Sequence, residues 1–284
     1  MLSAVRDITR ITGTAVVFVL AALALPAAFG VPTVRAAFHE LNAPRADDAA
    51  PPPARVAHDP AKPTAVVVVG DRGAVVSDTL APYEVLATTG AFNLYAVAPE
   101  VRPLPLTGGL DLVPDLDFAG LAGLLRGGAP DVVVVPAMSD VGENTSKPVT
   151  DWLELQAAAG SLLLGICNGA GVLASAGLLD GHRATAHWLR VDTFEDRYPA
   201  VDWVRGTRYV DDGDVITTAA ILSGVDGALR VVERRVGPDA AVRAAEAVGW
   251  RHHHRGSAAA LRGATLRPGD AGVGFNSAIG WVRD

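Results

Sequence analysis

Short apolar runs that recur along the middle of the chain constrain its fold more than any other feature. Each run is β-branched or aliphatic and is followed by a turn signal; the runs are Ala65–Val69, Asn93–Val97, Val132–Val135 and Ser161–Ile166. Continuous apolar runs of this length are typical of parallel strands that are buried on both faces of a sheet. We therefore predict buried parallel strands at these positions.

Helical patterns lie between and after the apolar runs. We expect helices over Pro82–Thr89, Phe118–Leu125, Pro148–Ala159, Gly169–Ala176, Ser223–Val236 and Pro238–Ala247. Because strands alternate with helices, residues 64–250 are predicted to form one α/β domain with a doubly wound, mostly parallel sheet and flanking helices. A hairpin is expected at Tyr209–Ile216, around the turn Asp211–Asp214.

The segment before this domain has the character of a membrane anchor or a signal. Within residues 1–40, the charge-free run Ile11–Val31 has about the 20 residues that a membrane-spanning helix needs. The alternatives are a cleaved signal peptide and a core helix. Arg6 and Arg10 precede the run, so the positive-inside rule predicts a single-pass protein with its folded domain outside the cytoplasm. A cleaved signal would make the protein secreted.

The remaining segments read as connecting and terminal regions. Residues 41–63 are rich in Pro and Ala and are expected to be a linker. Residues 251–284 are expected to be a polar tail. Three consecutive histidines, His252–His254, lie at its start, but they cannot all face one ion from a regular element. We therefore expect neither a metal site nor a cofactor.

Composition excludes several classes of function. Half of the residues are hydrophobic, which excludes a disordered chain. The net charge of −7 argues against a nucleic-acid partner, which would need a basic surface. Cys167 is the one cysteine, so the chain has no internal disulfide and no CxxC pair. If the thiol has a function, it acts as a thiol.

The segment Ser161–Ala174 carries the most informative motif. A strand pattern leads into Gly-Ile-Cys-Asn-Gly, the G-x-C-x-G form of a nucleophile elbow with Cys167 as the nucleophile, and then into a helix pattern. Gly165 and Gly169 leave room for a sharp, strained turn. We expect the thiol to lie at a helix N-terminus that favours the thiolate and lowers its pKa. The alternative is a small buried hydrophobic residue.

Two other residues are candidate partners of this thiol. His187, in Ala184-Thr-Ala-His-Trp, follows the elbow by one helix and one short strand, and a Cys–His pair is a nucleophile with its base. Asp78 follows the first strand, at the edge where open α/β sheets bind ligands, and could share a proton with the thiol. The alternatives are a structural histidine beside Trp188 and a helix-capping aspartate.

Weaker candidates complete the predicted site. Glu84 and Trp188 are candidates for ligand contact, and the alternative for Glu84 is a solvated helix face. The backbone amides of Asn168 and Met138 are candidates for stabilising a developing negative charge.

The order of these motifs resembles the ThiJ/PfpI superfamily, whose fold is that of class I glutamine amidotransferase domains. The order is a first-strand acid, a V-V-V-V-P turn, a G-x-C-x-G elbow and A-T-x-H-W. The local sequences around Cys167 and His187 are similar to those of isonitrile hydratases and of the sensor domains of AraC-type regulators. The resemblance implies that Cys167 is the nucleophile, Asp78 the proton-sharing acid and His187 a base or supporting histidine. It also suggests a homodimer.

The chain departs from the family pattern at several positions. Leu189 stands where glutaminases carry a carboxylate, so glutamine hydrolysis is not expected. Asn168 stands where the peptidase branch has His, which argues against a peptidase. Isonitrile hydratases have Thr at the same position, which argues against that activity as well. Ala137-Met138 replaces a Gly-Gly pair, so side chains crowd the second oxyanion donor. The residues after Trp250 are too few for an AraC-type DNA-binding pair.

Three hypotheses follow from these residues. In the first, the protein is an enzyme in which Cys167 attacks a small electrophilic molecule for hydration or hydrolysis, with Asp78 relaying the proton and His187 assisting. In the second, the same pocket senses a ligand or an oxidant, with the thiol converted to a sulfenate. In the third, the domain is a degenerate structural unit with an ordinary thiol.

Overall fold

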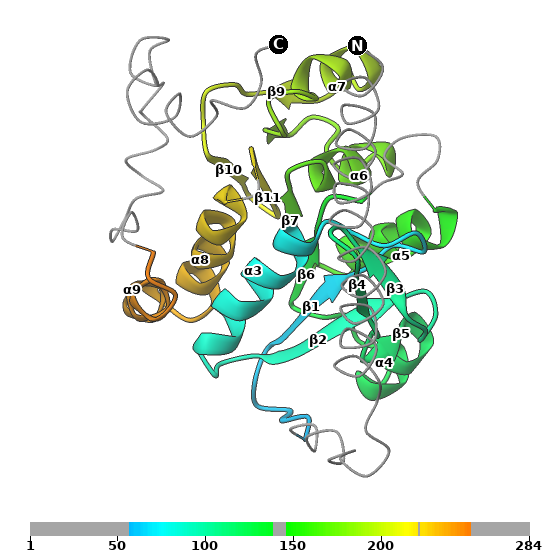
Figure 1. Cartoon of the computed structure of the whole chain (residues 1–284), viewed down its shortest axis with the longest axis vertical. Coiled ribbons are helices and arrows are strands. Elements are labelled where there is room, and N and C mark those ends of the chain that lie inside the picture. Colours follow the sequence, from blue (N-terminus) through cyan, green and yellow to red (C-terminus); the bar gives the residue numbers. More distant parts are fainter. Residues whose placement is uncertain (1–56, 139–145, 221, 251–284) are drawn as a thin grey trace, which may run out of the picture. The chain divides into compact units, whose positions relative to one another are not determined.

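The computed structural model of the chain describes residues 57–138, 146–220 and 222–250. Its centre is a seven-stranded sheet in the order β10-β11-β7-β6-β1-β2-β5 (Figure 1). The strands are β1 (Thr64–Val68), β2 (Asn93–Ala98), β5 (Leu116–Asp117), β6 (Val132–Val135), β7 (Leu162–Ile166), β10 (Tyr209–Asp212) and β11 (Val215–Thr218). Every neighbouring pair is parallel except β10 and β11, which form an antiparallel hairpin.

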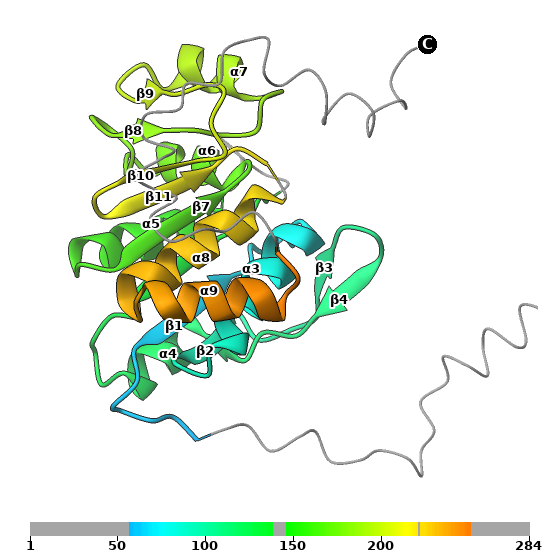
Figure 2. The same cartoon turned by 90° about the vertical axis from the view of Figure 1, so that its left-hand side faces the viewer.

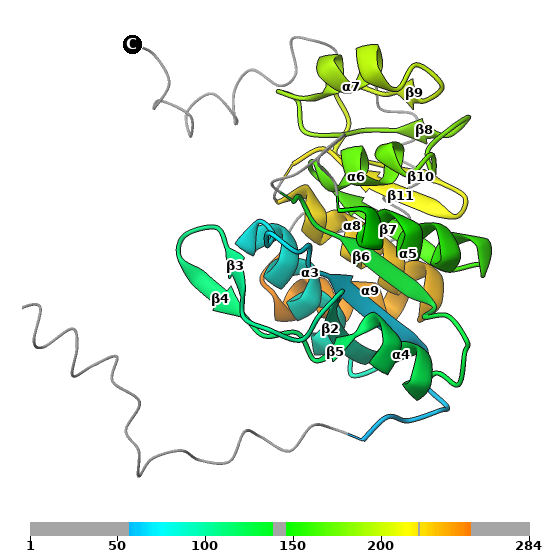
Figure 3. The same cartoon turned by 90° about the vertical axis from the view of Figure 1, so that its right-hand side faces the viewer.

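Helices cover both faces of this sheet (Figures 2 and 3). One face carries α3 (Val76–Thr88), α8 (Ser223–Arg235) and α9 (Pro238–Ala247), which pack against one another. The other face carries α4 (Phe118–Leu124), α5 (Lys147–Ala158) and α6 (Gly169–Ser175), with α7 (Val191–Arg197) beyond them. Two small two-stranded sheets complete the fold: β3 (Leu104–Leu106) with β4 (Leu110–Leu112), and β8 (Arg183–Ala184) with β9 (Asp202–Trp203).

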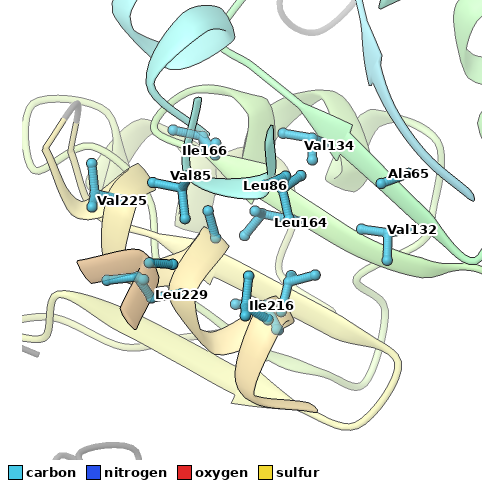
Figure 4. Packing of buried hydrophobic residues seen from close by; sticks show 14 of the residues in the cluster. Ala65, Val85, Leu86, Val132, Val134, Leu164, Ile166, Ile216, Val225 and Leu229 are labelled. Atoms are coloured by element: carbon cyan, nitrogen blue, oxygen red, sulfur yellow. The ribbon is translucent and has the colours of Figure 1, made fainter. Parts of the chain in front are cut away.

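The apolar strand residues divide between two cores because alternate side chains point to opposite faces of a sheet. Ala65 and Val67 of β1 belong to the core under α3, α8 and α9, whereas Val66 and Val68 belong to the core under α4, α5 and α6. In the first core, Leu86 of α3 and Leu229 of α8 lie among the strand residues, as Figure 4 shows. Burial on both faces explains why these strands read as continuous apolar runs.

The predicted fold is confirmed within the described residues. The four apolar runs form β1, β2, β6 and β7, and the hairpin is β10–β11. The predicted start of the first helix is wrong, because α3 begins at Val76 and Pro82 lies inside it. A proline often marks the first turn of a helix. Here the helix begins about two turns before Pro82, and Asp78, Thr79 and Pro82 are buried along one face of α3.

The folded part begins before the predicted domain boundary, because the end of the predicted linker packs onto β2. The Asn93 side chain donates to the carbonyl oxygens of Asp59 and Lys62 at 2.8 and 3.0 Å, and accepts the Asp59 N–H at 2.9 Å. His58 lies 3.1 Å from the Tyr95 hydroxyl. The first strand is therefore preceded by a short segment that is fixed at the amino edge of the sheet.

The predicted membrane span, residues 11–31, and the predicted polar tail, residues 251–284, lie outside the described residues. Among the helices of the described part, none has the length and apolar character that a membrane crossing requires.

Candidate functional site

The residue Cys167 forms a strained elbow between β7 and α6. Its φ is 57°, in the left-handed region that residues other than glycine rarely adopt. Its backbone N–H donates to the Thr218 carbonyl oxygen at 3.1 Å, so the neighbouring strand β11 fixes the turn. This geometry confirms the sharp turn that the G-x-C-x-G motif predicts.

The two glycines of the motif are required by close contacts. A Cβ on Gly169 would lie 2.0 Å from the Val135 carbonyl oxygen at the end of β6. A Cβ on Gly165 would lie 2.9 Å from Cδ1 of Leu173. Since the first of these contacts is with backbone, a side chain at Gly169 would push the elbow away from the sheet.

The carboxyl group of Asp78 lies beside the Cys167 thiol. Asp78 is in the first turn of α3 and is fully buried. Its carboxyl group accepts the Ala137 N–H at 3.3 Å and a long hydrogen bond from the Ser77 hydroxyl at 3.5 Å, and it hydrogen-bonds the Cys167 side chain. It caps no helix end, so the capping alternative does not apply.

Three adjacent strands bring these groups together at the carboxyl edge of the sheet. Cys167 follows β7, Ala137 follows β6, and Asp78 lies in the first turn of the helix after β1. Ligands bind at this edge in open α/β sheets. The position that the sequence predicts for Asp78 and Cys167 is therefore the one observed.

Burial and mutual charge set the protonation of this pair. Burial raises the pKa of the Cys167 thiol to about 12, and the Asp78 charge adds to the effect, while the Asn168 N–H opposes it. Burial also raises the pKa of Asp78 to about 6, against its hydrogen bonds from Ala137, Ser77 and Cys167. At neutral pH the pair therefore holds one proton, on sulfur, and Asp78 is the acceptor.

The expectation of a thiolate with a lowered pKa is wrong. The sulfur does receive a backbone N–H at the start of α6, as the helix-terminus argument requires. However, Cys167 is only 6% exposed and faces a carboxylate. Both conditions disfavour a second negative charge, and together they outweigh one hydrogen bond.

The two predicted oxyanion donors, the backbone amides of Asn168 and Met138, have different surroundings. The Asn168 N–H is directed at the Cys167 sulfur in this resting form. Met138 is buried, and its side chain packs against the loop after β1, with Sδ 2.8 Å from where a Cβ on Gly70 would lie. The role of either amide in stabilising negative charge stays a prediction.

The structure does not join His187 to the Cys167–Asp78 pair. Among the described residues, no hydrogen bond links His187 to either member; its Nδ1 instead accepts the Leu189 N–H at 3.3 Å. Neutral His187 therefore carries its proton on Nε2. Partial burial lowers its pKa, so the ring is neutral at physiological pH. This placement resembles the structural alternative, and a role as base stays a prediction.

The weaker candidates, Trp188 and Glu84, are exposed, unlike the buried Cys167–Asp78 pair. Trp188 is 58% exposed, with its ring centroid 5.7 Å from that of His187. Glu84 is exposed on α3, whereas Asp78 on the same helix is buried. An exposed Trp188 could still contact a ligand from the surface, but Glu84 has the character of a solvated helix residue.

Sequence reasoning missed two residues that hold the site. The Ala137 N–H fixes Asp78, and the Thr218 carbonyl oxygen fixes Cys167. Both contacts use backbone atoms, whose partners depend on strand order. The V-V-V-V-P turn before Ala137 was the available signal. In the described part of the chain, no group of three or more His, Cys, Asp or Glu side chains is placed to hold a metal ion.

Comparison with known proteins gives a family match, curated relatives and similar solved structures. Residues 64–234 match the DJ-1/PfpI family. The isonitrile hydratase of Pseudomonas putida is 33% identical over 166 residues, which cover 58% of this chain and 68% of that protein. The HTH-type transcriptional regulator CdhR of Pseudomonas aeruginosa is 35% identical over 116 residues, 41% of this chain but only 34% of the regulator.

Among solved structures, an AraC family transcriptional regulator from Pseudomonas putida superposes with a TM-score of 0.55 at 24% identity, covering 66% of this chain and all of that chain. At this identity the likeness concerns the fold. The family match over residues 64–234 includes the Cys167 elbow.

Proposed function

Because the chain belongs to the DJ-1/PfpI family, we propose that it is an enzyme in which Cys167 hydrates or hydrolyses a small electrophilic molecule. One observation carries the proposal: a thiol on a strained elbow is hydrogen-bonded to a buried carboxylate that can take its proton. Nucleophilic catalysis by cysteine needs this combination of a nucleophile and an adjacent base. The 33% identity to an isonitrile hydratase makes isonitriles the first substrate class to test.

The raised thiol pKa determines how the reaction begins. Since the resting pair is a thiol and a carboxylate, the proton passes from Cys167 to Asp78 as sulfur attacks the isonitrile carbon. Asp78 then delivers this proton to the same carbon. The product of the first step is a thioimidate, R–N=CH–S–Cys167, and Asp78 is again a carboxylate.

Water completes the reaction in the second step. Its oxygen adds to the thioimidate carbon, and one of its protons reaches nitrogen through Asp78. The carbon–sulfur bond then breaks, and the remaining hydroxyl proton passes to sulfur. The products are a formamide, R–NH–CHO, and the free Cys167 thiol, so one water is consumed and the enzyme is unchanged.

The test uses the full-length chain and benzyl isonitrile. We expect formation of the formamide, with a loss of turnover in both Cys167→Ala and Asp78→Asn and an unchanged far-UV circular dichroism spectrum. Full activity of either variant would contradict the proposal.

A ligand-sensing role is the second candidate, because the thiol is protonated at rest and the regulator CdhR is 35% identical over 116 residues. Sensing of an oxidant is less favoured, since oxidation proceeds through the thiolate. A small molecule that stabilises the wild-type chain and the Cys167→Ala variant equally, in the absence of any turnover, would favour ligand sensing.

We further propose, from the sequence, that residues 11–31 hold the protein at the membrane and that the folded domain forms a homodimer. Full-length protein in a carbonate-washed membrane fraction would support the anchor, whereas a shortened N-terminus on protein in the medium would indicate a cleaved signal. Light scattering of the detergent-solubilised chain measures its oligomeric state.

A further inference from the structure

The side chain of Asn168 does not cap the helix that it precedes. It occupies the N-cap position of α6, directly after Cys167. Asparagine at an N-cap normally accepts a hydrogen bond from an amide of the first helical turn. Here its side chain makes no capping hydrogen bond. The first-turn amides donate to backbone instead: Ala170 to the Cys167 carbonyl oxygen, and Gly171 to the Asn168 carbonyl oxygen at 2.9 Å.

The Asn168 Oδ1 atom is therefore a buried acceptor without a donor among the described residues. A buried amide oxygen without a partner is costly, and native proteins nearly always satisfy it with protein or with water. The oxygen is therefore available to a molecule that enters the site.

A second buried polar atom without a partner belongs to Thr218, which also contacts Cys167. Among the described residues, the buried side-chain polar atoms that lack a hydrogen-bond partner include Asn168 Oδ1 and Thr218 Oγ1. Both residues are bound to Cys167 through their backbones: Thr218 accepts its N–H, and Asn168 donates to its sulfur. Two unsatisfied polar atoms thus belong to residues that hydrogen-bond Cys167, and buried polar atoms of this kind are commonly satisfied by a small polar molecule such as water.

We infer that the Asn168 carboxamide oxygen positions the water that attacks the carbon bound to Cys167. The inference rests on the proposed function. In the second step, water must donate two hydrogen bonds near sulfur, one to the base that takes its proton and one to a group that orients it. The Asp78 carboxylate and the Asn168 carboxamide oxygen are both acceptors, so together they match the two O–H groups of one water.

The predicted effect is confined to the second step. Sulfur attack in the first step needs only Cys167 and Asp78, so it does not depend on the Asn168 side chain. Water addition to R–N=CH–S–Cys167 gives R–NH–CH(OH)–S–Cys167, and this addition slows when water is no longer oriented. Loss of a positioned reactant costs on the order of 100-fold in rate. The covalent thioimidate then accumulates.

The experiment is a single-turnover reaction of the full-length chain with benzyl isonitrile, followed by intact-protein mass spectrometry. The Asn168→Leu variant keeps a similar shape and the backbone N–H but has no side-chain acceptor. We expect it to form the Cys167 adduct at the wild-type rate and to release formamide roughly 100-fold more slowly. The conservative Asn168→Ser variant restores an oxygen and is expected to recover part of the release rate.

The pH profile of Cys167 alkylation is the control for an intact elbow. An unchanged profile in both variants shows that the sulfur and its hydrogen bonds are undisturbed. Wild-type release of formamide by Asn168→Leu, without adduct accumulation, overturns the inference and leaves the proposed function standing. Loss of adduct formation in Asn168→Leu also overturns it, because the side chain would then act in the first step. Absence of adduct and product in the wild-type chain removes both proposals.

Discussion

The Asp78 carboxylate accepts a hydrogen bond from the Cys167 thiol although both groups are buried. The two residues come from α3 and from the β7–α6 elbow, and the sheet alone brings them together. A buried carboxylate beside a thiol keeps the proton on sulfur, and the same carboxylate is the group that can remove it. This relationship leads to the first two predictions.

The first prediction concerns the reactivity of the thiol. Iodoacetamide should modify Cys167 slowly at pH 7, and the rate should rise throughout the alkaline range, because the pKa of the thiol is raised to about 12. The Asp78→Asn variant should react faster at pH 8, since it removes the negative charge and leaves the burial. Mass spectrometry of the modified chain measures both rates. A wild-type rate that reaches its plateau below pH 8 would contradict the prediction.

The second prediction concerns stability and pH. The folded-state pKa of Asp78 is about 6, above its ordinary 3.8, so its contribution to the free energy of unfolding is complete below pH 4 and is lost as pH rises through 6. The loss amounts to about 3 kcal/mol. Asp78→Asn should therefore gain stability over wild type between pH 4.5 and pH 7. Urea unfolding of both proteins at pH 4.5 and pH 7 measures the difference in their free energies of unfolding. A variant whose stability relative to wild type falls between pH 4.5 and pH 7 would contradict the prediction.

The third prediction concerns strain at the elbow. Because Cys167 has a φ of 57°, Cys167→Gly should be more stable than Cys167→Ala by about 1 kcal/mol. Ala174 in α6 is a control of opposite sign, since Ala174→Gly should lose at least about that amount in a buried helical position. Denaturant unfolding of the three variants tests the comparison. Equal stabilities of Cys167→Gly and Cys167→Ala would mean that the turn is not strained.

The fourth prediction concerns the contact between the elbow and β6. Gly169→Ala should destabilise the fold by about 2 kcal/mol or more, because the added Cβ would lie 2.0 Å from the Val135 carbonyl oxygen. Gly123→Ala in α4 is a matched control: nothing lies within 4 Å of its Cβ, and alanine is the better helix former, so a gain of up to about 1 kcal/mol is expected. Thermal unfolding of both variants distinguishes a local clash from a general effect of replacing glycine.

Much of the fold could be predicted from sequence because its signals are local. The apolar run Val132–Val135 is β6, and Pro238–Ala247 is α9 with the predicted bounds. The start of α3 could not be predicted in this way, because burial of its first turn depends on the packing of other elements.

The residues of the site could be predicted from sequence, but their protonation states could not. The motif identifies Cys167, and its place after the first strand identifies Asp78. The protonation of the thiol depends on how deeply it is buried and on the distance of Asp78, which tertiary structure decides. Among the described residues His187 has no hydrogen bond to the pair, and its segment follows β8, which pairs with β9 and not with the main sheet.

The segment fixed ahead of β1 has a mechanical consequence. Tension that arrives along the chain from residues before His58 would first load the hydrogen bonds between Asn93 and the Asp59–Lys62 backbone. These bonds lie at the amino edge of the sheet, whereas the elbow lies at the carboxyl edge. A pull on the N-terminal side would therefore break these hydrogen bonds at the amino edge before any force reached the sulfur.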